Sequence, residues 1–148
     1  MVRALGSIVA VAALTLVAAC SGGSAENPRE AKFKAIAKAN KAIGEELKKD
    51  APSVELVAAN AKTLDGLARE LPGWFPGATG PEPGIETEAK PDIWQKPTEF
   101  KAAAAKFAAA TGVLQAAAAT GDVAQVKAAA AGVGPACKGC HDSFRLKK

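Results

Sequence analysis

The chain has 148 residues, a length typical of one domain, and its residues are 49% hydrophobic. Its formal net charge of +4 is spread along the sequence rather than gathered in a block, so we expect no nucleic-acid partner. A mildly basic surface of this kind fits either an acidic redox partner or solubility alone.

The N-terminal segment is predicted to be an export signal rather than part of the fold. Arg3 precedes an apolar run, Ile8 to Ala19, that is too short and wrongly flanked for a membrane-spanning helix. The run ends in Val17-Ala18-Ala19-Cys20, which resembles a bacterial lipobox. That resemblance implies cleavage before Cys20 and a diacylglycerol group on its sulfur. The alternative is an ordinary signal peptide with a free cysteine close to the cleavage site.

A lone cysteine followed by the flexible stretch Ser21-Gly22-Gly23-Ser24 favours the lipid anchor, since two acyl chains hold a protein stably on a membrane. We therefore expect a signal peptide of the lipoprotein type (1–19), a tether (20–26) and one folded domain (27–148). The protein is expected in the periplasm, anchored to a membrane through lipidated Cys20. Ser21 favours the outer membrane if the organism is Gram-negative.

Four amphipathic segments follow, each with apolar residues at alternating spacings of three and four. The first begins at Asn27-Pro28 with Asn27 as N-cap, the second near residues 50–53, the third near Thr98 and the fourth near Asp122. The expected buried seams are Phe33, Ile36, Asn40, Ile43 and Leu47; Val54, Val57, Ala61, Leu64, Ala68 and Leu71; Phe100, Ala103, Phe107, Ala110 and Leu114; and Val123, Val126, Ala130, Val133, Cys137, Cys140 and Phe144. This pattern predicts an all-α fold, an antiparallel four-helix bundle. Alanine at many seam positions leaves room for a large flat group.

Two features interrupt the helical pattern. Residues 72–97 form a long connection rich in proline and glycine, which we expect to be ordered because it carries the apolar anchors Trp74, Phe75, Ile85, Ile93 and Trp94. Within the fourth segment, Pro135 cannot donate a hydrogen bond to the carbonyl of Ala131, so we expect a kink or a break there.

The motif that carries chemistry is Cys137-Lys138-Gly139-Cys140-His141, a C-x-x-C-H sequence typical of haem c attachment. The two thiols add to the two vinyl groups of haem, and the histidine becomes the proximal iron ligand. On a helix these three side chains share one face. The chain has three cysteines, of which lipid would use one and haem two, so no disulfide is expected. We predict one covalently attached haem c, with His141 as the axial ligand of its iron.

Competing chemistries lack the residues that they need. A zinc site would require a fourth good ligand, but His141 is the only histidine and Cys20 lies at the far end of the chain. A thioredoxin-like cysteine pair belongs with strands, and none is predicted. Neither a Ser-His-Asp set nor a phosphate-binding glycine loop is visible. We therefore expect a protein that is not an enzyme.

Several local sequences together resemble the cytochrome c′ family, over about residues 27–148. They are Arg29 with Phe33, Leu71-Pro72-Gly73-Trp74-Phe75-Pro76, Gly80-Pro81-Glu82, Ala89-Lys90-Pro91-Asp92-Ile93-Trp94, and the run from Cys137 to Arg145. The resemblance implies a four-helix bundle with haem between the helices, a periplasmic location and, in most members, a pentacoordinate, largely high-spin iron. A low-spin branch with a methionine ligand also exists. Family members are often homodimers through their first two helices, so a homodimer is one expected state.

The resemblance also assigns roles to three further residues. Arg29 would pair with a haem propionate, the alternative being a solvated charge. Phe33 would face the distal side of the iron, the alternative being plain core packing. Arg145 would lie over the proximal histidine, the alternative being one member of a basic tail with Lys147 and Lys148.

Composition restricts the sixth ligand of the iron. The only methionine is Met1, which would leave with the signal peptide, and the only histidine is already the axial ligand. Lys32 is a remaining candidate, although its amine would have to be neutral and buried. We predict an open iron site guarded by Phe33, which also argues against peroxidase turnover because a distal acid or base is absent.

These features favour a haem protein that binds small gaseous ligands, with nitric oxide the preferred ligand and carbon monoxide another. The alternative function is a dedicated one-electron carrier with a redox-protein partner and no physiological gas ligand. A third interpretation is a tethered haem protein whose chemistry is vestigial.

Overall fold

The computed structural model describes residues 27–77 and 84–147, so the predicted signal peptide, the tether and Cys20 lie outside the described residues. The described chain is almost entirely helical. Its elements are α1 (Pro28–Glu46), α2 (Val54–Glu70), the 3₁₀ helix η1 (Leu71–Trp74), the short α3 (Asp92–Gln95), α4 (Pro97–Thr120) and α5 (Val123–Phe144). Within the described ranges there is no strand, and the one sheet-like pairing is an isolated antiparallel bridge between Ala89 and Arg145.

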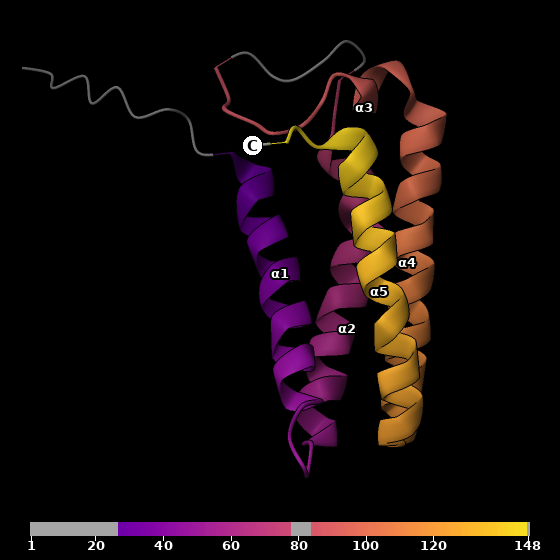
Figure 1. Ribbon diagram of the computed structural model, residues 1–148. Coiled ribbons are helices and arrows are strands. Elements are labelled where there is room, and N and C mark those ends of the chain that lie inside the picture. Colours follow the sequence, from indigo (N-terminus) through magenta and orange to yellow (C-terminus); the bar gives the residue numbers. More distant parts are fainter. Residues whose placement is uncertain (1–26, 78–83, 148) are drawn as a thin grey trace, which may run out of the picture.

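The four long helices α1, α2, α4 and α5 form an antiparallel bundle, which confirms the predicted fold (Figure 1). The main contacts run from α1 to α2, from α2 to α4 and from α4 to α5. The described chain begins and ends at the same end of the bundle, where η1, α3 and the segment before α3 also lie (Figure 1). A cavity lined by residues of α1, α5 and the crossover lies toward this end of the bundle.

The helix starts follow from the capping residues of the sequence. The side chain of Asn27 accepts from the backbone N–H of Arg29 at 3.0 Å, and Asp122 accepts from the N–H groups of Ala124 and Gln125. Each such cap stabilises a helix by about 1 kcal/mol. Helix α4 begins with Pro97 at its first position and ends at Gly121, whose φ of 77° is a left-handed conformation that suits glycine.

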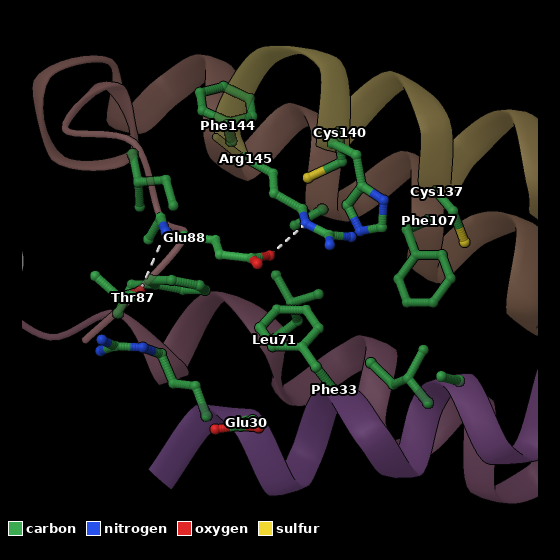
Figure 2. Close-up of a pocket in the computed structure, with 18 of the residues that line it drawn as sticks. Glu30, Phe33, Leu71, Thr87, Glu88, Phe107, Cys137, Cys140, Phe144 and Arg145 are labelled. Carbon is green, nitrogen blue, oxygen red and sulfur yellow. Dashed lines mark hydrogen bonds and ion pairs between the residues drawn. The ribbon is translucent and has the colours of Figure 1, made fainter. Parts of the chain in front are cut away.

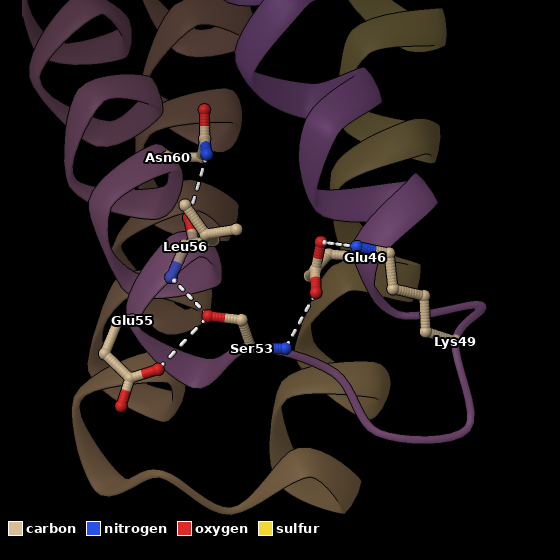
Figure 3. Close-up of polar contacts among 6 residues, drawn as sticks. All are labelled: Glu46, Lys49, Ser53, Glu55, Leu56 and Asn60. Atoms are coloured by element: carbon tan, nitrogen blue, oxygen red, sulfur yellow. Dashed lines mark hydrogen bonds and ion pairs between the residues drawn. The ribbon is translucent and has the colours of Figure 1, made fainter.

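The turn between α1 and α2 depends on Glu46, which is only 8% exposed (Figure 3). Its carboxylate accepts from Lys49 Nζ at 2.6 Å and from the backbone N–H of Ser53 at 2.7 Å. The Ser53 hydroxyl in turn caps α2 by accepting from the N–H of Leu56 at 3.3 Å. The hydrogen bond from Lys49, followed by that from Ser53, lowers the pKa of Glu46.

Most of the predicted seam residues of α2 and α4 are buried, although Val54, Ala103 and Ala110 are only half-buried, and the seam of α1 is displaced by one position. Ala39, Ile43 and Glu46 are the buried residues in the second half of α1, whereas Asn40 is exposed and Leu47 is half-buried. The expected burial of Asn40 is therefore wrong. The reason is that α1 packs mainly on α2. Asn40, which the heptad pattern predicted to contact another helix, borders a cavity instead.

Of the kink or break expected at Pro135, the break does not occur, because helix α5 runs continuously from Val123 to Phe144. Pro135 and Ala131 are both exposed, and water can therefore satisfy the carbonyl that loses its partner. Val126 and Val133 are buried on the opposite side, and α5 makes its main contacts with α4. This packing offsets the cost of an interior proline, about 3 kcal/mol.

The crossover is anchored as expected at Trp74, Ile93 and Trp94, which are buried, whereas Ile85 is half-buried and residues 78–83 lie outside the described residues. The Trp94 indole donates to the carbonyl of Pro76 at 3.0 Å. Phe75 makes edge contacts with the rings of Trp94 and Phe100, whose centroids lie 5.9 and 5.1 Å away. These contacts hold the crossover against the end of the bundle.

Candidate functional site

A cavity of about 1050 Å³ opens between α1 and α5 at the crossover end of the bundle. That volume is at the upper end of the range of about 300–1,000 Å³ usual for small-molecule and cofactor sites. Helices α2 and α4 provide its floor through Leu64, Phe100, Ala104 and Phe107, and η1 adds Leu71. The walls are mostly apolar, and polar residues gather at the end near the start of α1 and the residues 86–89.

The α5 wall carries the haem-attachment motif. Cys137, Cys140 and His141 all line the cavity, as expected from their spacing on one helical face (Figure 2). Both thiols are half-buried and free, and this burial raises the pKa of each. Burial, followed by the positive charge of Arg145, lowers the pKa of His141, while Asp142 and Glu88 act in the opposite direction. The lowered pKa favours the neutral ring, the form that binds a metal.

Phe33 lies on the facing wall and extends from α1 toward the α5 side of the cavity (Figure 2). Its ring meets Trp74 edge-on at a centroid distance of 5.4 Å and lies 6.3 Å from the ring of Phe75. It is nevertheless only half-buried. The two predicted roles, core packing and facing a ligand in the cavity, are thus compatible in one position.

Arg29 is buried, with 3% of its surface exposed, which is rare for arginine. One guanidinium nitrogen donates to the carbonyl of Trp74 at 3.4 Å, and the group lies 5.1 Å from the centre of the Phe75 ring. Arg29 also lines the cavity. It is therefore not a solvated charge, and its pairing with a haem propionate remains a prediction about this buried cation.

Arg145 lies just beyond the end of α5, where its backbone N–H donates to the carbonyl of His141 at 3.0 Å. Its side chain lines the cavity, and its Nε donates to Glu88 at 2.7 Å (Figure 2). Sequence reasoning missed Glu88. The residue lies in a connection without periodicity and is 57 positions from its partner, so no local pattern pointed to it.

Lys32, the remaining candidate for a sixth ligand, has contacts typical of a charged ammonium. Its Nζ lies 4.9 Å from the centre of the Trp74 ring and 4.0 Å from a carboxylate oxygen of Glu70. Its side chain is 45% exposed. These surroundings favour a solvated cation rather than the neutral, buried amine that iron ligation requires.

The residues of this cavity fit a covalently attached haem. Two thiols and one imidazole share the α5 wall, the other walls are apolar, and a buried guanidinium stands at the polar end. Phe33 and Ile36 belong to the apolar seam of α1 yet remain half-exposed, because they border the cavity instead of a neighbouring helix. A flat, largely apolar group bound to α5 would complete their burial.

Comparisons with known proteins agree with this fit. Residues 25–145 match the profile of the family described as Cytochrome C′. A cytochrome c′ of Rubrivivax gelatinosus is 43% identical over 125 residues, which cover 84% of this chain and 96% of that protein. The crystal structure of cytochrome c′ from Rubrivivax gelatinosus, 41% identical, superposes with a TM-score of 0.71 over 79% of this chain and 91% of that chain.

A second solved structure is informative about ligands. It is the nitric oxide complex of a mutant cytochrome c prime from Alcaligenes xylosoxidans. It is 29% identical to this chain and covers 81% of it and 91% of its own chain, with a TM-score of 0.70.

Proposed function

The chain belongs to the cytochrome c′ family, and from that premise we propose that it is a monohaem cytochrome whose iron has His141 as its only protein ligand and binds small gaseous ligands. Proteins of this family carry one covalently attached haem c. The observation that carries the proposal is the placement of the Cys137–Cys140–His141 face and of Phe33 on facing walls of one cavity.

The α5 wall provides covalent attachment and the axial ligand. Each thiol, Cys137 and Cys140, would add across one vinyl group, so that sulfur bonds to carbon and the thiol hydrogen moves to the neighbouring carbon. The ring of His141 lines the cavity from the same face and would be the iron ligand. When bound, the haem supplies an iron atom that takes a diatomic ligand and exchanges single electrons.

The α1 wall determines what else can approach the iron. Phe33 has no hydrogen-bond donor and no ligating atom, so it excludes water and restricts space without occupying a coordination position. A small neutral molecule such as nitric oxide or carbon monoxide needs no donor there, whereas dioxygen is disfavoured by the lack of one. The nitric oxide complex of the Alcaligenes xylosoxidans relative supports this choice of ligand.

One observation supports the second candidate function, one-electron transfer with a redox-protein partner. His141 is exposed on part of its surface, and Cys140 is half-buried, so the α5 side of the cavity borders solvent. A haem edge on that side would be accessible to a partner. Against a dedicated carrier, a single protein ligand implies larger reorganisation of the iron on electron transfer than two ligands do.

We also place the protein in the periplasm, held on a membrane by lipid on Cys20. The C-x-x-C-H motif supports the first part, because haem c is attached outside the cytoplasm in bacteria, and the lipobox-like sequence supports the second. Mass analysis of the mature N-terminus tests the anchor. A diacylglycerol adduct on Cys20 is expected, whereas an unmodified cysteine would contradict it.

The test of ligand binding is a titration of the ferrous, haem-loaded protein with nitric oxide and, separately, with carbon monoxide, followed by absorption spectroscopy. We expect both gases to produce saturable spectral changes with one site per chain. If the spectrum stays unchanged with both gases, the gas-binding function is refuted and electron transfer becomes the better proposal.

A further inference from the structure

Residues 86–89 line the polar end of the cavity, and we call the segment 86–90 the strap. One side of the strap is attached to α1, since the Asn27 amide donates to the carbonyl of Glu86 at 3.1 Å. The other side is attached to the end of α5. The N–H of Leu146 donates to the carbonyl of Glu88 at 2.8 Å, and the N–H of Lys90 donates to the carbonyl of Phe144 at 2.9 Å.

Helical geometry does not hold the side chain of Arg145. Its backbone has left the helix and is extended, with φ −115° and ψ 135°. The antiparallel bridge to Ala89 fixes the backbone of Arg145 against the strap, but it leaves the long side chain free to rotate. A second contact is needed to keep the guanidinium at the cavity wall.

Glu88 provides that contact, with 2.7 Å between its carboxylate and Arg145 Nε (Figure 2). Asp142, an acid of α5 itself three residues before Arg145, is already engaged by Lys138. The Arg145 and Glu88 side chains are 51% and 36% exposed, so the pair itself contributes little to the stability of the fold. The Arg145–Glu88 pair therefore matters because it fixes the position of the Arg145 charge, not because it stabilises the fold.

Both members of the pair lie close enough to act on His141. Arg145 and Glu88 line the same cavity as His141, and the backbone N–H of Arg145 donates to the carbonyl of His141 at 3.0 Å. A fixed positive charge near the iron favours the ferrous over the ferric state, because the ferric state carries one more positive charge. The position of the guanidinium thus influences the reduction potential of the site.

We propose that Glu88 is a positioning residue: from the strap, its carboxylate holds the Arg145 guanidinium beside the axial ligand and so sets the local charge that the iron experiences. This inference rests on the proposed function, in which His141 ligates haem iron. It assigns to the strap a role in tuning the haem, in addition to lining the cavity.

The test compares two substitutions in two backgrounds of the haem-loaded protein, with the midpoint potential as the measurement. Glu88→Gln removes the negative charge but keeps an amide oxygen that can accept from Arg145. Glu88→Ala removes both the charge and the acceptor. Each of these two Glu88 substitutions is made both in the natural chain and in a chain that carries Arg145→Gln. Glu45→Gln is the control, since Glu45 also forms a surface ion pair, with Lys41, but lies at the opposite end of α1.

In the natural chain, Glu88→Gln is expected to raise the potential more than Glu88→Ala does, because alanine also lets the cation move into solvent. With Arg145→Gln, the two substitutions should raise it equally, and Glu45→Gln should leave it unchanged. Equal shifts from Glu88→Gln and Glu88→Ala in the natural chain, or no shift from either, would overturn the positioning role. If the purified natural chain instead carries no covalent haem, that result would refute the proposed function, on which this inference rests.

Discussion

Replacing Phe33 with alanine tests whether its ring guards the iron. If a gas molecule has to displace the ring, binding is weakened by the energy of the contacts that the ring loses. Those contacts are the pairs with Trp74 at 5.4 Å and with Phe75 at 6.3 Å, each worth about 0.5–1.5 kcal/mol. Their sum of about 1–3 kcal/mol corresponds to a 5- to 150-fold increase in affinity when the ring is removed.

The assay is the equilibrium affinity of the ferrous Phe33→Ala protein for carbon monoxide, together with its unfolding by urea. The variant should bind carbon monoxide more tightly and unfold more easily, because a full core Phe→Ala costs about 3–5 kcal/mol and Phe33 is only half-buried. Val57→Ala is the control, since Val57 is 2% exposed and not among the cavity-lining residues. It should lower stability without changing affinity. An unchanged affinity in a destabilised Phe33→Ala protein would refute the guarding role.

Three predictions concern the bundle. Thr111 is fully buried, and its hydroxyl donates to Asp65 at 3.1 Å. Thr111→Val should remove one donor from that carboxylate and lower the free energy of unfolding, measured in urea, by about 1–3 kcal/mol. An unchanged free energy would show that this link between α2 and α4 is dispensable. Pro135→Ala should raise the thermal midpoint, because the new N–H can donate to Ala131 and an interior proline costs about 3 kcal/mol, and a lower midpoint would contradict this. The pKa of Glu46 is lowered in the folded state, so its stabilisation is present above the unfolded value of 4.5 and is lost as the pH falls through the folded pKa. The stability difference between the natural chain and Glu46→Gln should therefore shrink on acidification, and a difference independent of pH would count against the carboxylate's role.

Local signals predicted much of this fold because they act over a few residues. Asn27, Ser53 and Asp122 cap their helices through side-chain hydrogen bonds to backbone N–H groups two or three positions ahead. The face shared by Cys137, Cys140 and His141 follows from helical geometry alone. Such relations depend on no other part of the chain.

Relations between distant segments were not visible in the sequence. The heptad pattern of α1 assumed a helix on each side, so it assigned Asn40 to the core, whereas the cavity takes the place of one neighbour. A kink or a break was expected at Pro135, but the burial of Val126 and Val133 against α4, which keeps α5 continuous, could not be seen in the sequence. Glu88 could not be identified, because its partner Arg145 is brought near only by the pairing of the strap with the end of α5.

The burial of Arg29 is a similar case. Its position on the apolar stripe of α1 suggested a role at the haem, but the crossover residues Trp74 and Phe75 are what enclose it. No periodicity in the connection predicted which of its aromatic residues would meet α1. The resemblance to the family supplied the expectation, and the packing of the crossover supplies its physical basis.

The absorption spectrum of the ferrous protein without added gas shows most directly whether His141 is the only protein ligand of the iron. We expect a broad, five-coordinate, high-spin spectrum. A sharp, six-coordinate, low-spin spectrum would contradict it, because a second side chain would then have to occupy the position that Phe33 is proposed to guard.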